Sequence, residues 1–189
     1  MSFNITPPPS EMDRRDEVLA KAYKNLIYFG RAFLPNDFLK KSESAPFHYE
    51  MGKKMIDTTP GARICNIIPR GHGKSVVAKA AIMHKLCFAA DDQQHFIAWV
   101  SEEQSQAIDH LKYIRSHFEN NKMIRYYFGN MDGGSVGKRW TEKDLVTPKG
   151  DRVISKGTSQ RLRGRAEVDV RYTGIVLDDF ESELNTKTP

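Results

Sequence analysis

The sequence lacks long hydrophobic runs and is poor in cysteine, and both features restrict what the protein can be. No apolar run approaches the roughly 18 residues that a membrane-spanning helix needs, so we expect no membrane span. The two cysteines, Cys65 and Cys87, lie in apolar surroundings without a CxxC spacing. This pattern indicates buried thiols in a reducing compartment rather than a disulfide framework or a zinc site. The six histidines form no HExxH pattern, and His110 and His117 are more typical of packed or solvated side chains than of metal ligands.

Length and composition are those of a globular domain. The chain has 189 residues, of which 39% are hydrophobic and 28% charged, with a net charge of +5. A chain of this length can form one α/β domain that buries roughly 70% of the surface its unfolded form exposes. Residues 1–10 contain three consecutive prolines and predict a flexible leader, which leaves residues 11–189 as the domain.

Hydrophobic periodicity predicts an alternation of strands and helices. Apolar residues spaced three and four apart predict helices, and short runs rich in isoleucine and valine predict buried strands. The expected elements are a helix over residues 11–34, a short helix from Phe47, a strand over 63–69, a helix over 74–89, a strand over 95–101, a helix ending near 120, a hairpin over 144–157 and a strand over 174–177. This order predicts an α/β fold with a mainly parallel central sheet flanked by helices, and with an N-terminal helical extension.

Residues 67–75, IIPRGHGKS, match a phosphate-binding loop apart from one glycine. The usual pattern is Gly, four free positions and Gly-Lys-Ser/Thr; here Gly73, Lys74 and Ser75 fit, whereas Ile68 takes the first position. Such a loop works because backbone N–H groups and a helix N-terminus surround phosphate oxygens while the lysine adds a full charge. Strand, glycine turn, lysine, hydroxyl and helix all occur in the required order. We therefore predict that the loop binds a nucleotide through Pro69, Arg70, Gly71, His72, Gly73, Lys74, Ser75 and Val76.

A second candidate site ends the last expected strand, in GIVLDDFES. Mg²⁺ bound to a nucleotide needs the loop hydroxyl, here Ser75, and an acid at the end of a neighbouring strand, for which we predict Asp178. Carboxylates at the end of a buried strand are costly unless they meet a cation or water. Asp179 or Glu181 would then orient the attacking water. Taken alone, an acidic strand end is equally typical of a helix N-cap or a loop.

Basic residues gather before this strand. Arg161, Arg163 and Arg165 surround Gly164, and we favour Arg163 as an arginine that reaches the γ-phosphate, with Arg70 as a second catalytic cation. The wider basic stretch from 138 to 171 could face a polyanion. Its candidate DNA contacts are Lys138, Arg139 and Lys149. The alternative is an ordinary solvated basic face.

Four segments in this order, IIPRGHGKS, FIAWVSEEQSQA, RLRG and IVLDDFE, resemble the ATPase domain of the large terminase subunit of tailed bacteriophages. The resemblance covers residues 47–181 and implies a P-loop NTPase of the ASCE type. It also implies a motor that uses ATP and Mg²⁺ to translocate double-stranded DNA into a capsid. The implied partners are the portal protein, the small terminase subunit and further copies of the chain in a pentamer-like ring, in the cytoplasm of the host cell.

The resemblance also implies roles for single residues. Members of the family often lack the first loop glycine and carry an arginine before GxGKS, as Arg70 is here. Their arginine-glycine pair, which can reach into a neighbouring subunit's site, matches Arg163, and the segment that contacts adenine matches Phe47 and His48, although glutamine is usual there. Asp179 stands where many relatives have a catalytic glutamate. Because the family continues through further strands, a Ser/Thr coupling segment and an RNase H-like nuclease, we interpret the chain as the N-terminal ATPase part, without nuclease residues.

Two other functions use the same features. A small-molecule phosphotransferase would share the loop and Mg²⁺, but it would need a lid and an acceptor pocket, for which the sequence shows no pattern. A nucleotide-binding or DNA-binding module that has lost turnover is the non-enzymatic alternative.

Overall fold

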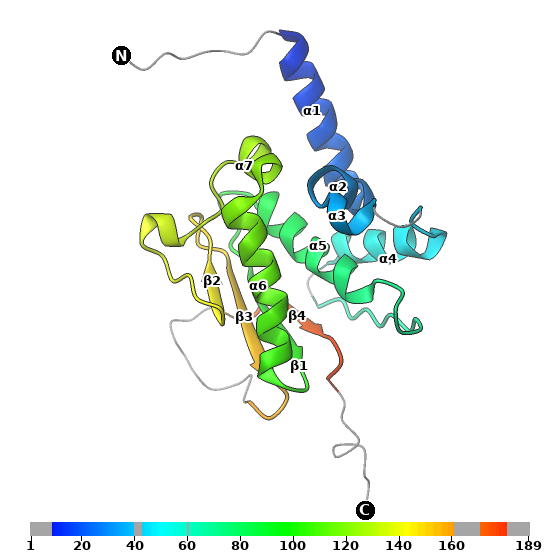
Figure 1. Ribbon diagram of the computed structural model, residues 1–189, viewed down its shortest axis with the longest axis vertical. Helices are drawn as coiled ribbons and strands as arrows, with labels where there is room; N and C mark the ends of the chain where they lie inside the picture. The colour runs from blue at the N-terminus through cyan, green and yellow to red at the C-terminus, as the bar shows by residue number, and fades with distance from the viewer. Residues whose placement is uncertain (1–8, 40–42, 60, 161–170, 181–189) are drawn as a thin grey trace, which may run out of the picture.

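The computed structural model describes residues 9–39, 43–59, 61–160 and 171–180 (Figure 1). The elements are α1 (Pro9–Lys24), α2 (Leu26–Phe33), α3 (Pro35–Phe38), α4 (Pro46–Ile56), α5 (Lys74–Cys87), β1 (Phe96–Ser101), α6 (Gln104–Asn120), α7 (Lys122–Phe128), the 3-10 helix η1 (Gly134–Val136), β2 (Asp144–Val146), β3 (Arg152–Gly157) and β4 (Gly174–Leu177). Of the predicted leader, only the last two residues are described, and they begin α1. No helix of the described ranges is long and apolar enough to cross a membrane.

The sheet is mixed and open, with the strand order β2-β3-β1-β4. β1 pairs in parallel with both β3 and β4, while β2 pairs antiparallel with β3. The predicted hairpin and the predicted parallel pairing are therefore both confirmed. Because α6 packs across β1 and β3, the chain has an α/β fold whose sheet is flanked by helices (Figure 1).

The two faces of β1 belong to different apolar clusters. Ile97 and Trp99 join the main core with α5 and α6, whereas Ala98 and Val100 pack with Ile154 in a smaller cluster. Successive side chains of a strand point to opposite faces, so this division follows from the register. All four of these β1 residues are buried, as expected for a strand with neighbours on both sides.

The N-terminal helices are part of the core. The single helix predicted over residues 11–34 is broken at Asn25, whose side chain accepts a hydrogen bond from the Tyr28 N–H and so caps a new helix, α2. Phe29 and Phe33 of α2 are fully buried. The ring of His84, in α5, lies 3.1 and 3.0 Å from the carbonyl oxygens of Ala22 and Tyr23 and links α5 to the end of α1.

The prediction of a buried strand over residues 63–69 is wrong. This segment is irregular, Ile67 is 93% exposed, and within the described ranges no strand pairs with it. An apolar run becomes a strand only where neighbouring backbone satisfies its N–H and C=O groups, and composition does not supply that neighbour. The prediction of two buried thiols also fails in part, because Cys65 is exposed while Cys87 is buried. Burial raises the pKa of the Cys87 thiol.

Close packing of α2 on α3 gives a stability prediction at Gly30. An added Cβ there would lie 2.6 Å from ring atoms of Phe38. Alanine normally stabilises a helix interior by about 1 kcal/mol relative to glycine, but this clash should reverse the sign. We expect Gly30→Ala to lower the free energy of unfolding by about 1–3 kcal/mol in chemical denaturation.

Gly52→Ala in α4 is the matched comparison. Its added Cβ would meet Leu26 Cβ at 3.1 Å, a milder contact, so a smaller change in the free energy of unfolding is expected. A stabilising effect of Gly30→Ala would contradict the observed packing of Phe38 on α2.

Candidate functional site

The glycine-rich segment forms a tight turn at the start of α5. Gly71 and Gly73 have φ values of 80° and 74°, in the left-handed region that glycine adopts without steric cost. Gly73 is the N-cap of α5, and Lys74 and Ser75 lie in its first turn. Nothing lies within 4 Å of a Cβ added at Gly71, so there the backbone conformation, not a lack of space, requires glycine.

The side chain of Lys74 bonds back to a residue that precedes the turn. Its Nζ donates a hydrogen bond of 2.5 Å to the carbonyl oxygen of Ile68, the residue at the position of the missing glycine. Ile68 contributes a backbone carbonyl and packs its side chain against the core, and φ is not positive there. The turn therefore forms without a glycine at this position.

The start of α4 lies against the same turn. His48 accepts a hydrogen bond at Nδ1 from the Ala45 N–H (3.0 Å), which leaves Nε2 to donate to the carbonyl oxygen of His72 (2.9 Å). The ring centroids of Phe47 and His72 are 6.2 Å apart. Phe47 and His48, expected near the adenine, are thus brought to the turn, and His48 fixes its backbone.

The acidic strand end is fixed to β1. The Asp178 N–H donates to the Val100 carbonyl (3.0 Å), and the Asp179 carbonyl accepts from the Glu102 N–H (2.9 Å). Asp179 has φ of 45°, a conformation that aspartate tolerates better than most residues. The side chain of Asp178 is 14% exposed, whereas Asp179 is exposed. Asp178 is therefore the carboxylate held inside the structure.

Groups from two helices surround Asp178. His110 of α6 places Nε2 3.5 Å from Asp178 Oδ2. Burial lowers the pKa of Lys79, in α5, and the carboxylates of Asp37 and Asp178 oppose this shift. Lys79 lies about one helical turn beyond Ser75, so its ammonium on α5 is within electrostatic range of the strand end. Burial likewise lowers the pKa of His110, against the opposing charge of Asp178.

Ser101 adds a buried hydroxyl at the carboxyl end of β1, the same end of the parallel strands as Asp178. Ser101 is the last residue of β1. It lies beside Asp178, because the residues before them, Val100 and Leu177, are paired in the sheet. Ser101 is 1% exposed, and its Oγ has no hydrogen-bond partner among the described residues. Buried hydroxyls normally have a partner, so a water or ligand oxygen would complete this one.

The oxygen donors at this site suit Mg²⁺ bound together with phosphates and waters better than a metal ion bound by protein side chains alone. No three His, Cys, Asp or Glu side chains are grouped closely enough to hold a metal ion within the described part of the chain. Mg²⁺ commonly takes one or two protein oxygens, several waters and phosphate oxygens. The Asp178 carboxylate and the Ser75 hydroxyl are donors of this kind.

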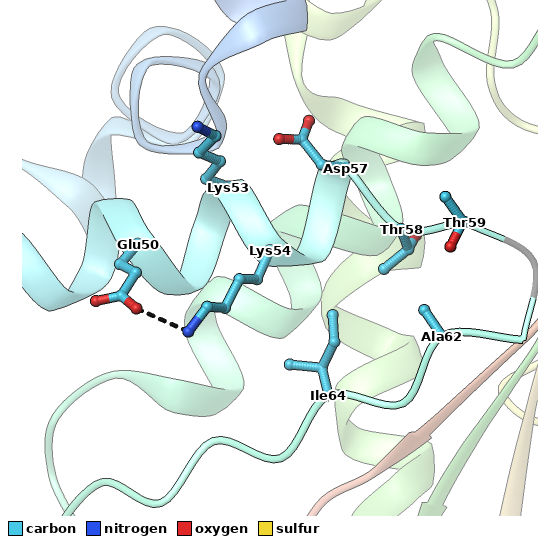
Figure 2. A pocket seen from close by; sticks show the side chains of 8 residues that line it. All are labelled: Glu50, Lys53, Lys54, Asp57, Thr58, Thr59, Ala62 and Ile64. Atoms are coloured by element: carbon cyan, nitrogen blue, oxygen red, sulfur yellow. Dashed lines mark hydrogen bonds and ion pairs between the residues drawn. The ribbon is translucent and has the colours of Figure 1, made fainter.

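A shallow pocket lies between α4 and the segment that follows it, away from the glycine turn. It has a volume of about 420 Å³ and is lined by Glu50, Lys53, Lys54, Asp57, Thr58, Thr59, Ala62 and Ile64 (Figure 2). Figure 2 shows Lys54 and Glu50 paired along α4, and the ion pair between them measures 2.7 Å. None of the residues predicted to bind ATP lines it, so it is not the predicted nucleotide site.

Of the other predicted residues, the structure describes only some, and those it describes do not join the turn. Arg163 and Glu181 lie outside the described residues. Arg139 is paired with Asp144 of β2 (2.8 Å) and Lys149 with Asp91 (3.0 Å), and β2 is at the opposite edge of the sheet from β4. Lys138 is exposed beside Arg139. The candidate DNA contacts are therefore separate from the candidate nucleotide site.

The carboxylate of Asp144 gives a pH-dependent stability prediction. Burial tends to raise its pKa, but hydrogen bonds from Arg152 and Arg139 outweigh this and leave the pKa lowered. A lowered carboxyl pKa contributes stability above the unfolded pKa, and this is lost as the pH falls through the folded pKa. We expect Asp144→Asn to cost about 2 kcal/mol of unfolding free energy near pH 7, and the difference from wild type to shrink below about pH 4.

Denaturation curves at neutral and acid pH measure this difference. Asp91→Asn is the control, because Asp91 is 91% exposed and its pair with Lys149 should contribute little. A loss in Asp144→Asn that does not depend on pH would contradict the assigned network.

Comparisons with protein-family models, curated proteins and solved structures found no match for this chain. Sequence analysis missed three groups near Asp178, namely Lys79, Ser101 and His110. Only Ser101 could have been predicted from the sequence. Parallel strands have their carboxyl ends on the same side of the sheet, and this places Ser101 beside Asp178.

Proposed function

We propose that the protein is the ATP-hydrolysing motor domain of a viral DNA-packaging terminase, which couples ATP hydrolysis to translocation of double-stranded DNA into a procapsid. One observation carries the nucleotide site. Helix α5 begins at a glycine turn closed by Lys74, and the charge of Asp178 acts on the pKa of Lys79, one turn beyond Ser75. A P-loop NTPase fold of the ASCE type is part of this proposal. The motor assignment rests in addition on the resemblance of residues 47–181 to the terminase family.

The glycine turn and Lys74 would bind the phosphates. The N–H groups of the first turn of α5 have no intrahelical partners and attract anions. Lys74, now on the Ile68 carbonyl, would exchange that contact for a phosphate oxygen, and the exposed Arg70 would add a second cation. Phe47 and His48 would contact the base.

Ser75 and Asp178 would hold the metal ion. Mg²⁺ bound there would neutralise charge on the phosphates as the γ-phosphoryl group is transferred to water. Asp179 or Glu181 would orient that water, and Arg163 would stabilise the charge that develops on the phosphoryl group. Asp178 is the more buried member of the acidic pair, which suits a fixed ligand better than a mobile base.

The proposed partners are duplex DNA, the portal protein, the small terminase subunit and further copies of the chain in a ring, in the host cytoplasm. DNA contact by Lys138, Arg139 and Lys149 predicts binding that weakens steeply as salt increases, because counterions are released from the phosphates. Arg139 and Lys149 must exchange acidic partners for phosphates. Electrophoretic mobility shifts at increasing salt measure this, and a flat response would contradict DNA contact there.

ATP hydrolysis measured with and without duplex DNA tests the proposal. We expect hydrolysis that requires Mg²⁺ and increases when DNA is added. Transfer of phosphate to a small acceptor would instead favour the phosphotransferase. Nucleotide binding without turnover, in the presence of DNA, would favour the non-catalytic module.

A further inference from the structure

The ring of His110 is held in one orientation beside Asp178. It stacks on the ring of Trp99 with centroids 4.4 Å apart and an interplanar angle of 27°. Trp99 is fully buried in β1, so the surface on which His110 rests is fixed. The side chains of His110 and Asp178 are 23% and 14% exposed. His110 therefore cannot move into bulk solvent without losing its stacking on Trp99, and Asp178 is the more buried of the two side chains.

Among the described residues, His110 is the only basic side chain within 4.0 Å of the Asp178 carboxylate. The Asp178 backbone is fixed by its hydrogen bond to Val100, but this bond does not determine the rotation of the carboxylate. Lys79 does not take this place, because its ammonium lies over the ring of Tyr113, 3.9 Å from the centroid. The distance of 3.5 Å from His110 Nε2 to Asp178 Oδ2 is longer than an ordinary hydrogen bond, so the two groups are close but not yet bonded. Contacts of this kind often tighten when a ligand binds.

We propose that His110 is a positioning residue, which donates from Nε2 to Asp178 Oδ2 and so orients this carboxylate for metal binding. A donor on one oxygen fixes the rotation of a carboxylate and leaves its other oxygen for the metal or a metal-bound water. Partners that orient a ligand in this way typically change metal affinity or activity by about 10–100-fold when removed. The inference rests on the proposed function, because it requires Asp178 to serve a bound metal ion.

Metal binding in the absence of turnover tests this role. Mn²⁺ affinity would be measured by electron paramagnetic resonance, in the presence of a non-hydrolysable ATP analogue. We expect His110→Ala to weaken Mn²⁺ binding by about 10–100-fold. Affinity for the analogue without metal should stay close to that of wild type, because His110 does not contact the glycine turn. His110→Gln retains a side-chain N–H donor of similar reach and should recover most of the affinity.

His117→Ala is the matched control in the same helix. Its imidazole contacts Asn121 and Tyr113 rather than Asp178, so Mn²⁺ affinity should match wild type. Wild-type affinity in His110→Ala would overturn the positioning role alone. Equal weakening in His117→Ala and in both His110 variants would show general destabilisation of α6 and would also overturn it. Absence of Mn²⁺–nucleotide binding in wild type would instead overturn the proposed function, and the positioning role with it.

Discussion

Replacement of Lys74 by alanine is expected to reduce ATP hydrolysis to background, a loss of at least about 10²–10³-fold in kcat. The lysine is the full positive charge of the glycine turn and would be preorganised at the point where phosphate charge develops. In the present structure its Nζ is held by the carbonyl oxygen of Ile68, so the ammonium already lies across the turn. Alanine removes the charge but leaves Gly71 and Gly73 to shape the backbone.

Lys54→Ala is the control for Lys74→Ala. Lys54 is 57% exposed, lies on the neighbouring helix α4 and pairs with Glu50, so its removal should leave hydrolysis close to wild type. Because Lys138, Arg139 and Lys149 are separate from the turn, Lys74→Ala should also retain most DNA binding. DNA-stimulated ATP turnover that persists in Lys74→Ala would exclude the glycine turn as the nucleotide site.

Replacement of Asp178 by asparagine is expected to lower hydrolysis by about 10²-fold or more and to shift its Mg²⁺ dependence to higher concentrations. Asparagine preserves the shape of the side chain but removes the charge and replaces one carboxylate oxygen by an NH2 group. The backbone hydrogen bond from Asp178 to Val100 does not depend on the side chain, so β4 should remain paired with β1. The loss would therefore report on metal binding rather than on the fold.

Asp109→Asn is the control for Asp178→Asn. Asp109 is 75% exposed on α6, pairs with Lys112, and lies next to His110 in the sequence. It should retain wild-type hydrolysis and Mg²⁺ dependence. A normal Mg²⁺ dependence in Asp178→Asn, measured by steady-state kinetics at saturating ATP, would contradict the assignment of this carboxylate.

Local patterns in the sequence predict the elements whose partners are close or whose turn chemistry is explicit. Helices α5 and α6 follow from apolar residues at helical spacing, and the β2–β3 hairpin from the turn around Pro148 and Gly150. The break at Asn25 was missed because apolar spacing continues through it while the asparagine side chain caps a new helix. An asparagine within a run of helical periodicity can be recognised as a cap only if each such residue is tested as the possible start of a new helix.

The segment 63–69 shows what composition cannot supply. Its isoleucines are typical of a buried strand, yet Ile67 is almost fully exposed because no described strand offers it a hydrogen-bonded neighbour. Pairing depends on residues distant in sequence, and a window of seven residues carries no information about them. The segment nevertheless delivers the Ile68 carbonyl to Lys74, so the turn forms without the expected strand.

In the candidate site, the glycine turn could be predicted from the sequence, whereas the contact between His110 and Asp178 could not. Glycine spacing and the following lysine encode the turn directly, since the left-handed backbone at Gly71 and Gly73 requires glycine. The sequence indicated a packed or solvated His110, and packing is correct for its stacking on Trp99, but its approach to Asp178 was not predicted. That approach depends on how α6 is rotated on β1, which packing of the whole core decides.

A double-mutant cycle on metal binding tests most directly whether the glycine turn and Asp178 bind one metal–nucleotide complex. Mn²⁺ affinity with a non-hydrolysable ATP analogue would be measured for Ser75→Ala, Asp178→Asn and the double variant. If both side chains hold the same ion, each single change weakens binding and the double change costs clearly less than the sum of the two, a coupling of about 0.5–3 kcal/mol. Additive effects, or no effect of either change, would contradict a shared metal site.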